Sequence, residues 1–100
     1  MDAYREAIRR QMQNYGKTGL LILADFKGGT PFLTASRAMH DFWEDKIELV
    51  TGLNLPMITE TLNSMEDGLT VRELAQCATE AGSEGVVNFR QAVAQKHHEH

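Results

Sequence analysis

The sequence contains little cysteine, no long apolar run and no basic patch. Cys77 is the single cysteine among 100 residues, so the chain forms no internal disulfide and suits a reducing compartment. No apolar run approaches the about 20 residues that a membrane-spanning helix needs, and the charged amino-terminal stretch is not a signal peptide. The net charge is −4 and basic residues cluster only at Arg9-Arg10, which argues against a nucleic-acid partner. From these absences we expect a cytoplasmic protein.

The composition is typical of one small globular domain. Apolar residues make up 42% of the chain and charged residues 24%, and 100 residues allow one domain with a modest core. The chain shows no repeats, low-complexity runs or interdomain linkers. We therefore expect one domain over residues 1–93 and a solvated tail over residues 94–100.

One stretch combines a strand, an acid, a turn and a helix start. Residues 20–24 are all apolar, which suits a strand covered on both faces in a parallel sheet. Asp25 follows at the carboxyl end of this strand, and Gly28-Gly29 allow a tight turn. Thr30 is the predicted N-cap of the next helix, and Pro31 fits its first position. Free amides and a helix dipole beside a carboxylate form a small anion pocket.

Periodicity and capping signals predict the remaining elements. We expect helices at about 2–14, 31–42 and 55–65, a further helix after Thr70, and strands at 19–24 and 47–50. The two strands form a right-handed βαβ unit with the helix between them. Thr70 and Glu73 form a capping box. After Gly82 and Gly85 the segment 86–89 fits either a short strand or a resumed helix.

A second loop, residues 51–56, follows the strand predicted at 47–50. Because parallel strands in one sheet end at the same edge, this loop and the loop at 25–30 are expected to emerge together. Asn54 can cap the following helix, and Thr51 and Gly52 lie near the same site. Two sets of unpaired helix amides therefore converge there, although a plain turn and cap would give the same glycine pattern.

Two motifs carry a family resemblance. Residues 25–32, Asp-Phe-Lys-Gly-Gly-Thr-Pro-Phe, resemble the D-x-x-G-G-(S/T)-P-F signature of the mannose-family IIA proteins of the bacterial sugar phosphotransferase system. Residues 51–57 resemble the second signature of that family, at the spacing typical of it. The resemblance runs from about Tyr4 to about Phe89. It does not include the strand and loop that carry the phosphorylated histidine in the family.

The resemblance implies an α/β fold: a three-layer α/β/α arrangement with a mostly parallel sheet, incomplete relative to the family domain. It favours a strand at 86–89, because the family ends in a short antiparallel strand exchanged between dimer partners. The β-strand edge beside residues 19–24 is expected to be bare, so we expect a homodimer formed through this edge or through residues 86–89.

The resemblance also implies a function and a site. A IIA phosphocarrier takes phosphate from a phosphohistidine carrier protein and passes it to a IIB partner that serves a membrane permease. Asp25 is the predicted catalytic residue, which orients the phosphorylated imidazole, while Gly28, Gly29 and Thr30 hold the phosphoryl group. That imidazole belongs to a histidine that is not in this chain, so the chain by itself is expected to be inactive as a phosphotransferase. No cofactor is expected.

The histidines of the chain do not match this role. His40 is expected about ten residues and ~15 Å from the anion pocket, along one helix. His97, His98 and His100 lie in the terminal tail, where nothing fixes a metal geometry, so no metal is assigned.

Two other functions remain open. One is a non-catalytic, truncated IIA-like module that dimerises or binds an anion. The other is the IIA-like phosphotransfer subunit that serves dihydroxyacetone kinase, whose domain is similar.

Overall fold

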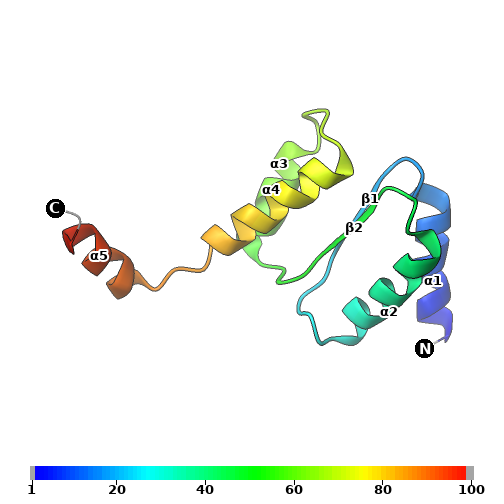
Figure 1. Ribbon diagram of the computed structural model, residues 1–100, viewed down its shortest axis with the longest axis horizontal. Coiled ribbons are helices and arrows are strands. Elements are labelled where there is room, and N and C mark those ends of the chain that lie inside the picture. The colour runs from blue at the N-terminus through cyan, green and yellow to red at the C-terminus, as the bar shows by residue number, and fades with distance from the viewer. Residues whose placement is uncertain (1, 99–100) are drawn as a thin grey trace.

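Helices flank a two-stranded parallel sheet in the computed structural model, which describes residues 2–98 (Figure 1). The elements in chain order are α1 (Asp2–Tyr15), β1 (Leu20–Leu23), α2 (Thr30–Met39), the 3₁₀ helix η1 (His40–Phe42), β2 (Ile47–Val50), α3 (Leu55–Ser64), α4 (Val71–Glu84) and α5 (Phe89–His98). In Figure 1, α1 and α2 lie on one side of the strands and α3 and α4 on the other. The predicted α/β class and its three layers are confirmed.

The sheet has the predicted parallel pairing. Its register runs from Leu20 opposite Ile47 to Leu23 opposite Val50. The crossover through α2 makes this pairing possible, since parallel neighbours need a long connection. Within residues 2–98 the sheet has these two strands, so one edge of β1 faces no described strand. None of the described helices has the length and apolar character needed to cross a bilayer.

The core lies between α1, α2 and the sheet. Four residues form its buried centre: Met12, Ala35, Ala38 and Ile47. Alanines on α2 let this helix approach its neighbours closely, and Met12 fills the space beside them. At the rim, Arg9 donates to Asp41 over 2.7 Å, and its guanidinium lies 5.3 Å from the centre of the Phe42 ring. These contacts join α1 to η1, the 3₁₀ helix that follows α2.

The capping box predicted for α4 is present. The Thr70 hydroxyl accepts the Glu73 amide over 3.1 Å, and a Glu73 carboxylate oxygen accepts the Thr70 amide over 2.9 Å. The Thr70 amide, which donates to the carboxylate, and then the neighbouring Thr70 side chain favour the charged form, so they hold the pKa of Glu73 below its ordinary value. The helix therefore starts where local sequence signals placed it.

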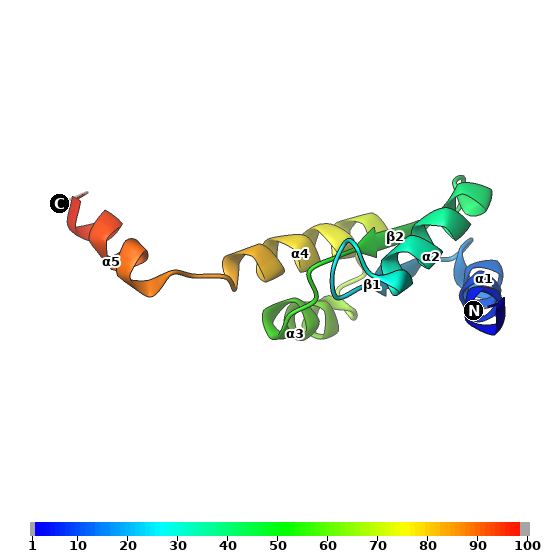
Figure 2. The ribbon, with the colours of Figure 1, turned by 90° about the horizontal axis from the view of Figure 1, so that it is seen from below.

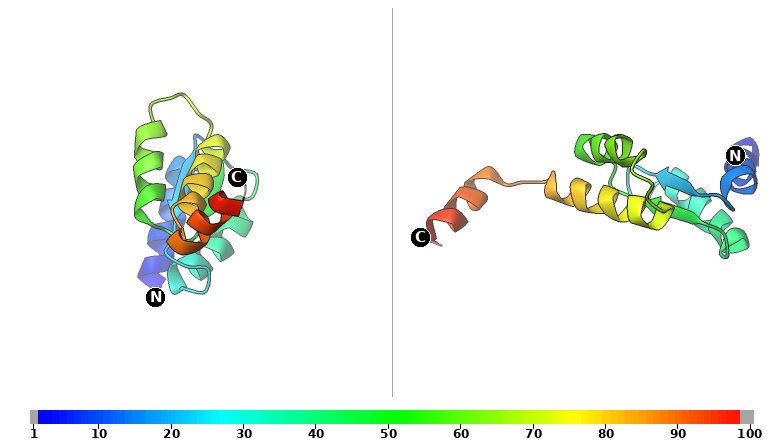
Figure 3. Two further views of the ribbon diagram at one scale, coloured as in Figure 1. Left: turned by 90° about the vertical axis from the view of Figure 1, so that its left-hand side faces the viewer. Right: turned by 90° about the horizontal axis from the view of Figure 1, so that it is seen from above.

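The carboxyl-terminal segment differs from the prediction. Residues 86–88 form no strand, and α5 begins at Phe89 and continues through residues 94–98, where a tail was expected. A strand needs a neighbour for its amides, and the described sheet contains β1 and β2 alone. Val86, Val87 and Phe89 are instead mostly exposed, at 77%, 65% and 78% of their surface. Figures 2 and 3 show α5 extending away from the other elements. The radius of gyration is accordingly 16.4 Å, against about 13 Å for a compact chain of this length.

Candidate functional site

The loops after β1 and β2 meet at the carboxyl edge of the sheet, as predicted. The Ala24 amide donates to the Val50 carbonyl over 2.9 Å, and the Leu53 amide donates back to the Ala24 carbonyl over 3.1 Å. These two bonds join the end of each strand to the loop of the other. The first loop, residues 25–29, and the second loop, residues 51–54, therefore lie side by side.

Asp25 is exposed on the first loop. One carboxylate oxygen, Oδ1, accepts the amide of Phe26 over 2.9 Å. Within the described residues this is the one hydrogen bond made by the Asp25 side chain. The Phe26 carbonyl in turn accepts the Gly29 amide over 3.3 Å, which closes a turn with Lys27 and Gly28 at its centre. Asp25 thus keeps acceptor capacity for an outside donor.

The amino terminus of α2 differs from the prediction by one residue. Gly29, not Thr30, is the N-cap, with φ −80° and ψ 158°, and its carbonyl accepts the Leu33 amide over 3.0 Å. Thr30 is therefore the first helical residue and its hydroxyl does not cap the helix. Because Pro31 has no N–H, the amides of Thr30 and Phe32 are the first-turn donors without a helical partner.

The two glycines of the first loop adopt ordinary backbone conformations. Neither Gly28 nor Gly29 has a positive φ, so the turn does not require them for backbone freedom. Instead, a methyl group on Gly29 would lie 3.2 Å from the Phe26 ring, and one on Gly28 would lie 3.6 Å from it. The ring lies against Gly29, which is buried, while Gly28 stays exposed. Sequence reasoning missed Phe26, because the signature treats that position as variable.

The second loop is shaped by Gly52 and Asn54. Gly52 has a φ of +82°, a left-handed conformation that favours glycine. The Asn54 side chain caps α3 as predicted, accepting the Met57 amide over 3.0 Å, and its amide nitrogen donates to the Gly82 carbonyl of α4 over 2.9 Å. Thr51 is half-buried beside them. Asn54 therefore holds the loop against α4, with both of its polar ends used inside the protein.

Replacing Asn54 with alanine is expected to lower the free energy of unfolding by about 2 kcal/mol, because one helix cap and one interhelical bond are lost together. Chemical denaturation of the two proteins measures this. The control is Asn63→Ala, an exposed asparagine on the same helix, which should change stability by less than about 0.5 kcal/mol. Equal losses in both variants would contradict the structural role of Asn54.

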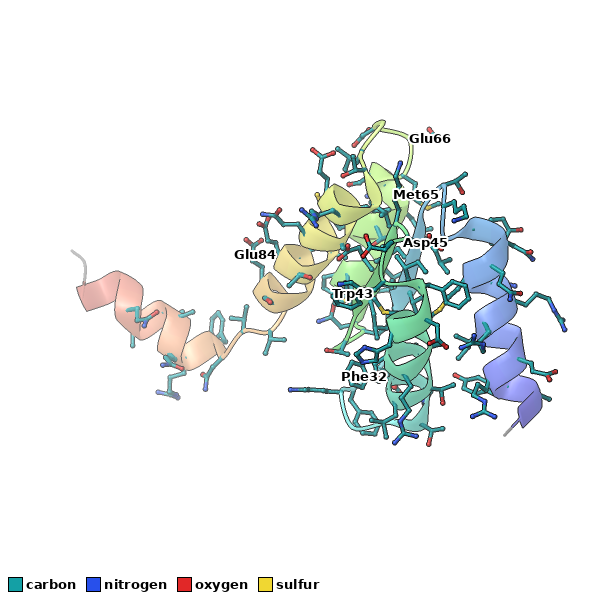
Figure 4. The ribbon with its side chains drawn as sticks, turned by 45° about the vertical axis from the view of Figure 1, so that its right-hand side comes forward. Phe32, Trp43, Asp45, Met65, Glu66 and Glu84 are labelled. Carbon is teal, nitrogen blue, oxygen red and sulfur yellow. The ribbon has the colours of Figure 1, made fainter. Side chains whose placement is uncertain are left out.

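His40 lies far from these loops. It ends α2, where its ring stacks with Trp43 at a centroid distance of 6.1 Å, about 15 Å along the helix from Thr30. Figure 4 shows Phe32 and Trp43 near opposite ends of α2. The side chains of His97 and His98, and all of His100, lie outside the described part of the chain. Within the described part, no histidine is positioned beside Asp25.

Comparison with known proteins agrees with this arrangement. Residues 1–79 match the EIIA-man family, described as the PTS system fructose IIA component. Over 68 residues the chain is 43% identical to the PTS system mannose-specific EIIAB component of Escherichia coli strain K12, and equally to that of Shigella flexneri. The match covers 68% of this chain and 20% of each relative, so the chain spans about a fifth of the curated relatives' length.

A solved structure shows the same fold. The crystal structure of phosphotransferase system component EIIA from Streptococcus agalactiae superposes with a TM-score of 0.70 at 29% identity, covering 87% of this chain and 68% of that one. The parallel α/β unit with two loops at one edge is thus that of a phosphotransferase-system IIA component. The chain belongs to the EIIA-man family.

Proposed function

We propose that this chain forms the phosphate-holding part of a IIA phosphocarrier. Phosphate passes from a phosphohistidine carrier protein to a histidine outside these residues, and then to a IIB partner. The observation that supports this most strongly is the Leu53–Ala24 hydrogen bond, which brings the second loop beside the loop that carries Asp25. Membership of the EIIA-man family supports the same role.

The chemistry assigns a task to each loop residue. Asp25 accepts the proton of one imidazole nitrogen, so the other nitrogen is free to attack phosphorus. The bond from phosphorus to the donor imidazole breaks as the bond to the acceptor imidazole forms. The amides of Thr30 and Phe32, at the positive end of α2, stabilise the phosphoryl oxygens. Gly28 and Gly29 have no side chain that would obstruct the phosphoryl group. Thr51 and Gly52, on the second loop, form the opposite side of the proposed phosphate site.

The open edge of the sheet and an exposed apolar segment support the proposed protein partners. The open edge of β1 and the exposed Val86, Val87 and Phe89 offer hydrogen bonds and apolar area to a second copy, so we propose a homodimer. The carrier protein and the IIB component bind at the loop edge. Through IIB the chain acts in the cytoplasm beside a membrane sugar permease.

Phosphoryl labelling tests the proposal. The chain is incubated with phosphoenolpyruvate, enzyme I, the carrier protein and the amino-terminal, histidine-bearing segment of a mannose-family IIA domain. Acid-labile phosphohistidine is expected on that segment when the chain is present. The same amount of label without the chain would contradict the proposal.

A second candidate is a non-catalytic anion-binding module. It is favoured by the position of His40, at the opposite end of α2 from Asp25. This candidate predicts that inorganic phosphate protects the chain against thermal unfolding while no mixture gives phosphohistidine. The alternative role, as the phosphotransfer subunit that serves dihydroxyacetone kinase, would instead require transfer of the phosphoryl group to that enzyme.

A further inference from the structure

We propose that Phe26 is a positioning residue, whose ring holds the Asp25–Thr30 loop in the conformation that presents the carboxylate and the α2 amides to one ligand. This inference rests on the proposed function for the identity of the ligand, a phosphoryl group. It concerns a side chain to which the proposed function assigns no contact with phosphate.

The first observation is the packing of the ring on the backbone. The carbon of a methyl group added to Gly29 would lie 3.2 and 3.3 Å from two atoms of the Phe26 ring, which is closer than ordinary van der Waals contact. Gly29 is buried although its neighbours Gly28 and Thr30 are exposed. The ring of Phe26 therefore covers Gly29, while 60% of the Phe26 surface remains open to solvent.

The second observation is that Phe26 connects both halves of the site. Its amide binds the Asp25 carboxylate over 2.9 Å, and its carbonyl accepts the Gly29 amide over 3.3 Å. Gly29 then accepts the first hydrogen bond of α2, from Leu33, over 3.0 Å. A shift of the ring on Gly29 therefore moves the start of the helix and the Thr30 amide relative to Asp25.

A substitution at Phe26 can remove the ring contact without removing the backbone hydrogen bonds. The backbone bonds of Phe26 persist in any variant, whereas the ring contact is lost in Phe26→Ala and kept in Phe26→Tyr. Asp25, Lys27 and Gly28 are exposed, so few other contacts restrain the loop. An unrestrained loop samples more conformations and loses entropy when it binds a ligand.

A double-mutant cycle with Gly29→Ala tests the proposal. The full chain is titrated with inorganic phosphate, and the dissociation constant is read from the amide resonances of Thr30 and Phe32. Gly29→Ala is expected to weaken binding by about tenfold when Phe26 is present, because the added methyl displaces the ring. Phe26→Ala should weaken binding by a similar factor. Gly29→Ala should add little in the Phe26→Ala background, since the clash is gone.

Two controls accompany the cycle. Trp43→Ala removes another exposed aromatic ring, beyond the far end of α2 from the loop, and should change phosphate binding by less than about twofold. Phe26→Tyr keeps the ring and should retain wild-type binding. Unfolding midpoints are measured for every variant, so a loss of fold is distinguished from a loss of position.

Additive effects of Gly29→Ala and Phe26→Ala would overturn the proposal, as would failure of Phe26→Tyr to retain binding. If wild-type protein binds no phosphate, the proposed function fails, and the positioning role is judged on hydrogen exchange of the Gly29 amide. That exchange should accelerate in Phe26→Ala and remain slow in Phe26→Tyr. Unchanged exchange in Phe26→Ala would refute the positioning role.

Discussion

Replacing Asp25 with asparagine is expected to slow the formation of phosphohistidine by about 10²–10⁴-fold. Asparagine has the same shape and its oxygen can still accept the Phe26 amide, so the loop keeps its hydrogen bond. The negative charge that holds the imidazole proton is lost, and the attacking nitrogen is then in the wrong protonation state. The rate of acid-labile labelling in the reconstituted mixture measures this effect.

Asp67→Asn is the matched control for charge. Asp67 is exposed in the turn after α3, and the substitution removes the same charge. Because exposed charges are screened beyond about 10 Å, this variant should label at the wild-type rate. A normal rate in Asp25→Asn, with the control also normal, would remove Asp25 from the mechanism.

Replacing Gly16 with alanine is expected to lower the free energy of unfolding by about 3 kcal/mol, the upper end of the usual range for overpacking. A methyl group there would lie 2.5 Å from the Met12 carbonyl, 2.9 Å from Asp45 Oδ2 and 3.1 Å from Ile47 Cδ1. The position cannot relax easily, because the Gly16 amide donates to Met12 and its carbonyl accepts the Lys46 amide over 2.7 Å. Gly16 thus joins the end of α1 to the start of β2.

Urea denaturation measures this loss. Gly28→Ala serves as the control, since the same methyl makes an ordinary 3.6 Å contact there and should cost less than about 0.5 kcal/mol. If the two alanine variants unfold at the same urea concentration, the close packing around Gly16 does not contribute to stability as described.

Local signals in the sequence predicted much of this fold. The apolar run at 20–24 and the segment Ile47–Val50 predicted the two strands, and the edge shared by their loops follows from parallel pairing. The capping box at Thr70 and the Asn54 cap were also predicted, because each depends on residues within one helical turn.

Features that depend on packing between residues were not predictable in this way. The α2 cap fell on Gly29 because that carbonyl accepts the first helical bond, which residue types alone do not reveal. The ring of Phe26 over Gly29 depends on a side-chain rotamer. The strand predicted at 86–89 was wrong for the chain by itself, since a strand exists only beside a partner. The phosphate-binding roles of Asp25 and its neighbours stay predictions.

The two loops are proposed to bind one anion together, and a titration of the chain with inorganic phosphate, followed by amide resonances, is the decisive test. We expect the Thr30 and Phe32 amides and those of residues 52–55 to shift together with a single dissociation constant. Shifts confined to one loop, or shifts in the two loops with different dissociation constants, would contradict it.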